Sequence, residues 1–423
     1  MLRKRKLGRG VAVVGAGMTK FGAYPKGVRT ADLFIEAFDD LKKSVDKGLQ
    51  PEDIEAFYIG NFSSDIFEKQ VHSAATVVSR LALVPSPGIK IENACGSSGV
   101  ALREGILAVA SGVYDMVVAG GMEKMTNLST SEVTETLGLA LDPVVEFPAG
   151  ETFPGIFATM GTAHMAKYGT TVEDFMRIGI KNHHNGGLNP KAHFDISIED
   201  FMKRRKAATA KKGLPEPQWA DEMEFLHDPS QNPIIAWPMR LFDCSTVCDG
   251  ASCVLLVAED IARDFTDNPL YVVGTGLASD YPVQDREDMA FLRGVAEAGK
   301  QAYEMAGVTP QDIKLAEVHD CFTVAEILGM EGLGLYQPGE AVKAIRQGET
   351  NLDGRLPINM DGGLKAKGHP VGATGTAMAV ELFLQMRGAA GKRQVKRQDT
   401  DLGIMLNFGA HGSTCVVNIF ERR

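Results

Sequence analysis

The sequence repeats itself, and this repetition limits the possible folds more than any other feature. A short apolar run that ends in glycine occurs at residues 11–17 and again at residues 271–276. Each run is followed by a helical stretch and then by a Pro-x-Asp-Ile junction, which begins at Pro51 in the first copy and at Pro310 in the second. The two junctions are 259 positions apart (310 − 51). Each apolar run is typical of a buried strand that leads into a glycine turn.

The repetition continues downstream in the same order. Gly96–Ala101 resembles Gly372–Ala377, and each segment opens a helix of small and apolar residues that leads into a further apolar strand. We expect these helices at residues 102–109 and 378–386, and the strands at 115–119 and 402–406. Strands that alternate with helices predict parallel or mixed sheets covered by helices. We therefore predict an α/β fold built from two duplicated halves.

Between the halves the character of the sequence changes. Glycine and proline breaks and a basic run at 203–206 predict an insertion with irregular structure and a few short helices. The run Cys253–Ala258 is then typical of a buried strand that belongs to the first half. The predicted boundaries are residues 1–125 with 233–268 for the N-terminal half, 126–232 for the insertion and 269–423 for the C-terminal half.

Charge and cysteine usage exclude several classes of protein. Lys and Arg number 44 against 54 Asp and Glu, and this net charge of −10 disfavours a general nucleic-acid binder. Six cysteines in 423 residues are too few for a disulfide framework, and the apolar run near the start is too short for a signal peptide or a membrane span. We expect a cytoplasmic protein that binds neither nucleic acid nor membrane.

The common cofactor and metal patterns are missing from the sequence. Gly15 and Gly17 follow a predicted strand, but Lys20 stands where a dinucleotide fingerprint needs glycine, and no Walker sequence occurs. Three cysteines whose spacing fits no common zinc pattern are expected to be buried thiols: Cys244, Cys248 and Cys253. Three histidines in a polar, glycine-rich stretch are expected at the surface: His183, His184 and His193. We predict no metal site and no permanently bound cofactor.

Cys95 lies between a predicted strand end and a predicted helix start. Its neighbours at 94 and 96–99 are small, so backbone and substrate can approach the sulfur closely. A thiol at a helix N-terminus faces free N–H groups and the positive end of the helix dipole, and both favour thiolate. A nucleophile is therefore the favoured interpretation, and a buried small hydrophobic residue is the alternative.

His369 lies in a glycine-rich turn before a helix, in the string Lys-Gly-His-Pro-Val-Gly-Ala-Thr-Gly that ends at Gly375. The duplication places His369 and Cys95 just before equivalent helices, so a pseudo-twofold arrangement would bring both to one crevice. A thiol that faces an imidazole forms an activated nucleophile. A helix-capping histidine is the alternative. A third polar segment, His319-Asp320-Cys321, directly follows an apolar run, and a satisfied core cluster is its alternative.

These segments together resemble the thiolase superfamily, and within it the thiolases of sterol-carrier-protein-2 (SCP2) type. The segment around Cys95, the Gly368-His369-Pro370 turn and the final loop at 407–412 occur in the family's order, and the resemblance covers nearly the whole chain. Residues 319–322 form His-Asp-Cys-Phe, the string of the SCP2-type branch, where the conventional thiolases carry Asn-Glu-Ala-Phe. The resemblance implies a duplicated thiolase fold: two pseudo-twofold-related βαβ halves in a layered αβαβα arrangement, with an inserted loop domain.

The resemblance also implies a role for each polar residue. Cys95 would attack the thioester carbonyl and hold the acyl group, and His369 would take the thiol proton and donate to an oxyanion. Cys321 would protonate or deprotonate the α-carbon, and His319 would position a water or the thioester oxygen. The backbone N–H groups of Cys95 and Gly409 would form a second oxyanion hole.

The chain departs from the family pattern in its final loop. The conventional thiolases carry an acid/base cysteine where this chain has Asn407, and Cys415, eight residues further on, is expected to be structural. His411 in the same loop either touches the substrate or is a turn residue. The basic run of the insertion either binds the phosphates of CoA or forms a solvated charged face; its candidate substrate contacts are Lys203, Arg204 and Arg205.

The implied function is that of a CoA-dependent thiolase, an acyl-CoA C-acyltransferase that cleaves or forms 3-oxoacyl-CoA through a Cys95 acyl-enzyme. CoA and acyl-CoA would be substrates, and branched or aromatic acyl groups such as benzoylsuccinyl-type CoA esters fit this branch. The implied assembly is a homodimer or a dimer of dimers, with a small zinc-ribbon/OB-fold protein as a further partner. Two alternatives are an SCP2-like retro-aldolase acting on CoA esters, against which Cys95 argues, and a non-catalytic CoA-binding subunit in a complex with that partner.

Overall fold

The computed structural model describes residues 5–397 and 399–423. Its centre is a nine-stranded mixed sheet in the order β3-β2-β4-β7-β1-β8-β11-β10-β9. The strands are β1 Val11–Met18, β2 Ala56–Gly60, β3 Gly88–Ile91, β4 Met116–Lys124, β7 Asp249–Ala258, β8 Leu270–Ser279, β9 Leu315–Val318, β10 Leu402–Gly409 and β11 Thr414–Glu421. Among the described helices, none is both long and apolar enough to cross a bilayer.

The strand order is symmetric about the contact between β1 and β8. Outward from that contact, β7, β4 and β2 on one side match β11, β10 and β9 on the other. The antiparallel β1–β8 pairing spans only Val11–Val13, whereas β1 pairs with β7 along its whole length. This short join lets the two halves of the sheet diverge. The predicted duplication and the α/β class are therefore confirmed in the strand topology.

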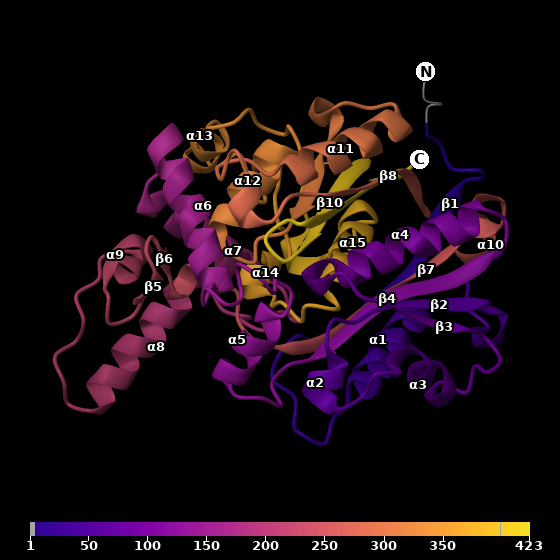
Figure 1. The fold of residues 1–423 in the computed structure, drawn as a ribbon, viewed down its shortest axis with the longest axis horizontal. Coiled ribbons are helices and arrows are strands. Elements are labelled where there is room, and N and C mark those ends of the chain that lie inside the picture. Colours follow the sequence, from indigo (N-terminus) through magenta and orange to yellow (C-terminus); the bar gives the residue numbers. More distant parts are fainter. Residues whose placement is uncertain (1–4, 398) are drawn as a thin grey trace.

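The helices lie in layers around the two halves of the sheet. α4 (Ser97–Ala110) and α15 (Thr374–Met386) contact each other and strands of both halves, so they form a middle layer. α1 (Thr30–Ser44) packs on β1 and β7, and α11 (Arg293–Ala306) packs on β8 and β11. Figure 1 shows the resulting order of helix, strand, helix, strand and helix, from α1 at the bottom to α11 at the top.

The repeated junctions of the sequence have the same local structure in both halves. Pro51–Asp53 and Pro310–Asp312 each form one turn of 3₁₀-helix directly before an equivalent strand, β2 or β9. Proline suits the first position of such a turn because its backbone has no N–H to satisfy. The shorter helices are α2 Ser64–Glu68, α3 Ser73–Arg80, α10 Ala262–Phe265, α12 Thr323–Gly332, α13 Ala341–Arg346 and α14 Gly363–Ala366.

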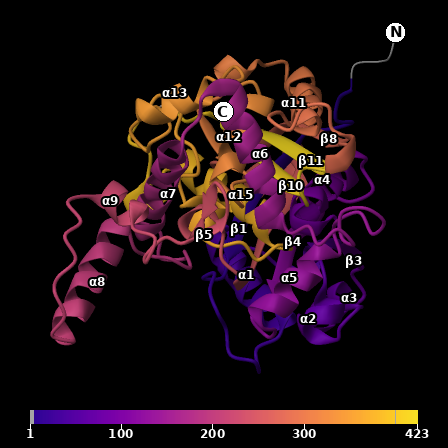
Figure 2. The same cartoon turned by 60° about the vertical axis from the view of Figure 1, so that its left-hand side comes forward.

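The segment between β4 and β7 is more helical than the sequence analysis predicted. It contains α5 Thr130–Gly138, α6 Phe153–Tyr168, α7 Val172–Gly187, α8 Ile198–Lys211 and α9 Glu222–His227, and a hairpin of β5 Ile234–Ala236 and β6 Met239–Arg240. The expectation of irregular structure was wrong because capping signals outweigh the glycine content. Ser197 and Asp200 cap the start of α8 reciprocally, as Thr171 and Asp174 do for α7. In Figure 2, α8 and α9 project from the side of the molecule.

The middle layer approaches the N-terminal half of the sheet through a glycine contact. A Cβ atom at Gly121 in β4 would lie 1.9 Å from the carbonyl oxygen of Gly372 and 2.5 Å from the Cβ of Ser98. Gly372 precedes α15 and Ser98 lies in the first turn of α4. A side chain at position 121 would therefore push the starts of both middle helices away from the sheet.

We expect the substitution Gly121→Ala to lower the free energy of unfolding by about 1–3 kcal/mol, because the backbone atoms that it meets cannot move aside. The matched control is Gly27→Ala, since no heavy atom lies within 4 Å of a Cβ there. This control should change stability by no more than about 0.5 kcal/mol. Urea denaturation midpoints measure both effects, and equal midpoints for the two variants would contradict the close contact.

Candidate active site

Cys95 lies in the turn that leads into α4. A 3₁₀ turn, Ala94–Gly96, precedes the helix, and the Ser97 hydroxyl donates to the Ala94 carbonyl at 2.7 Å. Ala94 has a φ of +49°, a left-handed conformation that costs a non-glycine residue about 1 kcal/mol or more. Strained backbone of this kind concentrates at functional sites. The turn leaves 8% of Cys95 exposed.

Burial favours the protonated thiol of Cys95. Burial raises the pKa of Cys95 to about 12, although the backbone N–H groups of Ala410 and of Cys95 itself oppose this shift. The backbone N–H groups thus act in the predicted direction, towards thiolate, but the loss of hydration outweighs them and the net shift is upward. A nearby base must remove the proton before the sulfur can act as a nucleophile.

His369 lies in the loop between α14 and α15. Gly368, just before it, has a φ of +114°, and a Cβ there would lie 2.8 Å from the Cys248 sulfur, so this turn requires glycine. The His369 N–H donates to the Cys248 sulfur at 3.1 Å, and the imidazole Nδ1 lies 2.7 Å from Thr374 Oγ1. Burial, aided by the charge of Lys367, lowers the pKa of His369 to about 3. The imidazole is therefore neutral and can accept a proton.

His319 directly follows β9, and its side chain is fully buried. The centre of its ring lies 4.1 Å from that of Phe408 and 5.1 Å from that of His369. Its Nδ1 lies 2.9 Å from Asn407 Nδ2, and the same amide nitrogen donates to the Cys95 carbonyl at 3.0 Å. Burial, with further contributions from His369 and Lys367, places the pKa of His319 well below its ordinary value.

Cys95, His319 and His369 converge on one point. The sulfur and one ring nitrogen of each histidine lie within 4.8 Å of one another. The Nε2 atoms of both histidines are buried and have no hydrogen-bond partner among the described residues, so they are available to a substrate atom. This spacing suits a thioester held between a nucleophile, a base and a hydrogen-bond donor. One sulfur and two imidazoles at this spacing also satisfy the geometric requirement for a metal ion.

Cys321 lies in the turn after β9, and its thiol is not among the three groups that lie within 4.8 Å of one another. Only 5% of the residue is exposed, and its carbonyl accepts from the Ser245 N–H at 2.9 Å. The pKa of Cys321 is raised well above its ordinary value, first by burial and then by the neighbouring Cys95 sulfur. A buried neutral thiol in this position can give a proton to a carbanion.

The final loop lies against the turn that carries Cys95. A Cβ atom on Gly409 would lie 2.3 Å from the Asn93 carbonyl oxygen, so the two backbones touch at this glycine. The N–H that hydrogen-bonds to the Cys95 sulfur belongs to Ala410, the residue after the predicted donor Gly409. Ala410 has a φ of +53°, a second left-handed residue beside the same thiol.

The side chain of His411 makes its polar contacts with Glu146 and Arg286. His411 is buried, with its Nε2 3.3 Å from the Glu146 carboxylate and its Nδ1 3.0 Å from an Arg286 nitrogen. It therefore ties the final loop to the insertion through protein contacts.

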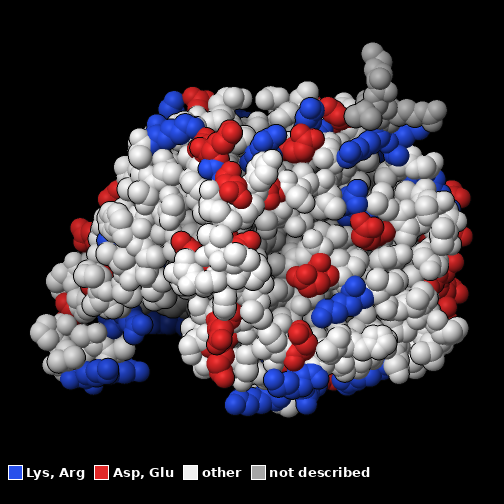
Figure 3. Space-filling model, in the orientation of Figure 1, with Lys and Arg blue, Asp and Glu red and all other residues white. Residues whose placement is uncertain are grey.

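The basic run lies on α8, far along the projecting part of the insertion. Lys203 is exposed and forms an ion pair of 2.8 Å with Glu199 on the same helix, and the next two residues are Arg204 and Arg205. In Figure 3, Lys and Arg side chains lie on this projecting part at the lower left, and a recess separates it from the main body.

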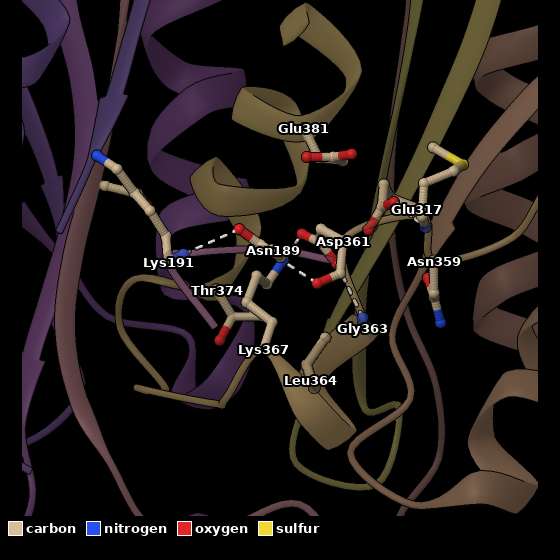
Figure 4. Close-up of polar contacts among 12 residues, drawn as sticks. Asn189, Lys191, Glu317, Asn359, Asp361, Gly363, Leu364, Lys367, Thr374 and Glu381 are labelled. Atoms are coloured by element: carbon tan, nitrogen blue, oxygen red, sulfur yellow. Dashed lines mark hydrogen bonds and ion pairs between the residues drawn. The ribbon is translucent and has the colours of Figure 1, made fainter. Parts of the chain in front are cut away.

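A buried ionic cluster surrounds Lys367, two residues before His369 in the chain (Figure 4). Lys367 donates to the Asp361 carboxylate, and Asn189 donates to the Asp361 carbonyl at 3.0 Å. Glu317 lies beside this pair, and burial together with the Asp361 charge raises the pKa of Glu317 well above its ordinary value. The cluster anchors the segment that leads to His369, and the positive charge of Lys367 helps to keep both active-site histidines neutral.

An apolar wall that was not predicted from the sequence lies beside Cys95. Its buried members are Phe67, Met125, Val133 and Val371. They come from separate segments: a short helix, the strand end before the insertion, the insertion itself and the loop after His369. No local pattern joins them, so only the tertiary structure reveals the wall.

His183 was wrongly predicted to lie at the surface. It is fully buried, with ring centres 5.4–5.7 Å from those of Phe194, Phe201 and Phe242. The unpredicted helix α7 turns one of two adjacent histidines inward, so His184 is exposed as expected. His193 is half-buried.

All six cysteines are free thiols. Cys248 and Cys253 are buried as expected, whereas Cys244 is only half-buried. Cys415 lies in β11 as expected, and its thiol donates to the Gly412 carbonyl at 3.2 Å. Cys248 contacts the site through the backbone of His369, and Cys244 pairs with Phe322, the residue after Cys321.

Comparisons with known proteins agree with this architecture. A family model described as "Thiolase, N-terminal domain" matches residues 11–260, and one described as "Thiolase C-terminal domain-like" matches residues 276–422. An acetyl-CoA acetyltransferase of Methanothermobacter thermautotrophicus is 40% identical over 98% of this chain and 100% of its own length. The benzoylsuccinyl-CoA thiolase subunit BbsB of Thauera aromatica is 29% identical over 92% of each chain. A solved structure described as an Ltp2-ChsH2(DUF35) aldolase has the same fold, with a TM-score of 0.76 over 98% of both chains at 23% identity.

Proposed function

The chain belongs to the thiolase family of acyltransferases, and we propose that it cleaves or forms 3-oxoacyl-CoA esters through an acyl-enzyme on Cys95. The observation that carries this proposal is the convergence of the Cys95 sulfur with the imidazoles of His319 and His369 within 4.8 Å. A neutral thiol beside a neutral imidazole can form its nucleophile by proton transfer at the moment of attack. CoA enters this chemistry as a substrate.

In the cleavage direction, His369 takes the Cys95 proton while the sulfur attacks the 3-oxo carbon of the substrate. The resulting oxyanion lies against the N–H groups of Cys95 and of the final loop at Gly409 and Ala410. Collapse of this intermediate breaks the C2–C3 bond, leaves the acyl group on Cys95 and places the electron pair on C2. The departing acetyl-CoA is then an enolate, whose thioester oxygen faces His319 and the protonated His369.

The remaining proton transfers restore the enzyme. The Cys321 thiol gives its proton to C2, which releases acetyl-CoA. The thiol of free CoA then loses its proton to the Cys321 thiolate and attacks the thioester on Cys95. The shortened acyl-CoA leaves, and the Cys95 sulfur recovers the proton that His369 held. Simple exchange of CoA between acyl-CoA molecules forms no enolate, so Cys321 keeps its proton throughout. In exchange, His369 gives the Cys95 proton to the departing CoA thiolate and then takes the proton of the incoming CoA thiol, so only Cys95 and His369 are needed.

The substrates are proposed from the walls of the site. The apolar wall beside Cys95 favours a hydrocarbon acyl group, which gains free energy by leaving water. The relative BbsB is named for a benzoylsuccinyl ester, so branched or aromatic 3-oxoacyl groups are the proposed acyl class. The recess beside α8 in Figure 3 is the proposed place for the CoA phosphates, with Lys203, Arg204 and Arg205 as their partners.

The proposed assembly is a homodimer or a dimer of dimers that binds a small zinc-ribbon/OB-fold protein. The solved aldolase supports the second partner because its name pairs a chain of this fold with a DUF35 component. Activity measured with and without such a protein tests this part of the proposal.

The acyl-enzyme is tested by incubating the protein with 3-oxoacyl-CoA esters and locating the acyl group by mass spectrometry after acid quenching and digestion. We expect the acyl group on the peptide that contains Cys95, with apolar branched or aromatic esters reacting fastest. A retro-aldolase would release a carbonyl compound without modifying Cys95, and a non-catalytic subunit would leave the ester intact. Either result would overturn the proposed function.

A further inference from the structure

The amide of Asn407 has only one orientation that satisfies its neighbours. Its Nδ2 lies 3.0 Å from the Cys95 carbonyl oxygen and 2.9 Å from His319 Nδ1, so its two N–H groups supply one hydrogen bond each. The reversed amide would place an oxygen against the Cys95 carbonyl oxygen, and two acceptors repel each other. The amide therefore donates to His319 Nδ1. A neutral imidazole that accepts at Nδ1 carries its proton on Nε2.

Two glycines of the repeat hold this amide in place. A Cβ atom on Gly99 or on Gly375 would lie 2.5 Å from Asn407 Oδ1. The two glycines occupy equivalent positions in the first turns of α4 and α15, and both are required for the amide to fit between the helices. Asn407 Oδ1 has no hydrogen-bond partner among the described residues. The side-chain hydrogen bonds of Asn407 to Cys95 and His319 are therefore both made by Nδ2.

Thr374 favours the opposite tautomer in His369, with the proton on Nδ1. The Thr374 hydroxyl has one proton, which it donates to the Pro370 carbonyl at 3.0 Å. Towards His369 Nδ1, 2.7 Å away, the same oxygen must then act as an acceptor. The proton of neutral His369 therefore lies on Nδ1, and its Nε2 has a free lone pair.

We propose that Asn407 is a positioning residue that keeps the proton of His319 on Nε2, so that His319 donates to the thioester oxygen while His369 accepts from Cys95. This inference rests on the proposed function and assigns opposite tasks to two imidazoles of the same site. It also makes Cys95, His319 and His369 a poor metal site, because the protonated Nε2 of His319 has no lone pair for an ion.

The groups around His319 keep its imidazole neutral, with the proton on Nε2, across the neutral pH range. Cys95 faces it from the start of α4, His369 and Lys367 from the loop before α15, and Phe408 beside Asn407 from β10. On its own segment, Asp320 turns away and accepts from the Leu364 N–H at 2.6 Å. Burial, with smaller contributions from His369 and Lys367, holds the pKa of His319 well below its ordinary value.

The substitution Asn407→Asp tests the proposal because a carboxylate accepts a hydrogen bond where the amide donates one. The Nδ1 of His319 would then hold the proton, and neutral His319 would present a bare Nε2 to the enolate oxygen. The added negative charge also raises the pKa of His319, so at low pH the imidazolium regains its Nε2 proton. The variant should therefore lose the donor as the pH rises through this new pKa, and recover it as the pH falls.

The measurement is the rate of carbon–carbon cleavage divided by the rate of labelled-CoA exchange into acyl-CoA, relative to the wild type at each pH. Loss of one oxyanion donor should lower this ratio about 100-fold at alkaline pH in Asn407→Asp. Asn407→Ala removes both hydrogen bonds but imposes no tautomer, so we expect a pH-independent fall of less than about tenfold. The matched control is Asn418→Asp in β11, which buries a carboxyl without a hydrogen bond to His319 and should leave the ratio unchanged.

A packing role for Asn407 would give the reverse ranking. The alanine variant, which leaves a cavity, would then be at least as impaired as the nearly isosteric aspartate variant, and neither ratio would depend on pH. Either outcome would overturn the proposal. A wild-type protein that fails to exchange labelled CoA would instead contradict the proposed function itself.

Discussion

Replacing Cys95 by alanine should lower the rate of 3-oxoacyl-CoA cleavage by about 10⁴-fold or more, because the acyl group then has no atom to which it can transfer. The fold should survive, since the side chain is small and its turn is held by the Ser97 hydroxyl and by the final loop. Cys95→Ser should be almost as impaired. A buried hydroxyl holds its proton more tightly than the thiol, whose pKa is itself raised to about 12 by burial. Steady-state cleavage and acyl trapping measure both variants.

The control for a lost thiol is Cys253→Ala, which removes a fully buried sulfur of β7 from the core cluster that packs against α1. This variant should lose some stability, about 1–2 kcal/mol, and keep kcat/KM within about threefold of the wild type. If Cys95→Ala instead retained activity within about tenfold of the wild type, the reaction would need no acyl-enzyme. A retro-aldolase, which uses no nucleophilic cysteine, would then be the better interpretation.

The duplicated architecture could be predicted from the sequence because its signals are local and occur twice. Pro51 and Pro310 each start one turn of 3₁₀-helix, and Gly99 and Gly375 each lie in the first turn of a middle helix. A glycine or proline fixes the backbone within a few residues, so such a signal survives without knowledge of distant contacts. Two copies in the same order then determine the symmetric strand order.

The insertion could not be predicted as well, because its helices depend on what they pack against. α7 has a mixed sequence, yet it contacts α12, α13 and α14 and buries His183 among three phenylalanine rings. The capping pairs at Thr171 and Ser197 were present in the sequence and mark where two of these helices begin. These capping pairs favour helix and the neighbouring glycines disfavour it. Only the tertiary contacts show that helix is the outcome.

The candidate site could also be predicted only in part from the sequence. The residue types of Cys95, His319 and His369 are visible in the sequence, as is the place of Cys95 and His369 before equivalent helices. Their protonation states are not, since burial by distant segments sets the pKa of each one. The contact of Asn407 with His319 was likewise invisible, because 88 residues separate the two in the chain.

Replacing Cys321 by alanine should separate the two half-reactions. Cleavage of the carbon–carbon bond should slow by about 10³-fold, because no thiol remains to give a proton to C2 of the departing enolate. Exchange of labelled CoA into acyl-CoA should stay within about threefold of the wild type, because that reaction uses only Cys95 and His369. Deuterium uptake at the α-carbon of acetyl-CoA provides a second measurement and should be lost together with cleavage.

The neighbouring thiol Cys244 provides the control, because burial raises its pKa to about 12 as well and it lies close enough to act on the pKa of Cys321. Cys244→Ala should slow neither half-reaction by more than about threefold. Equal loss of cleavage and exchange in Cys321→Ala would contradict the assignment, since it would indicate damage to the Cys95 turn. The sign of the pKa shift supports the expected result: a thiol whose pKa lies well above its ordinary value is protonated at neutral pH and is ready to act as the acid for cleavage. Asp320, the next acidic side chain in the segment, accepts hydrogen bonds from Asn182 and the Leu364 N–H, so it faces the start of α14 and leaves Cys321 as the proton donor.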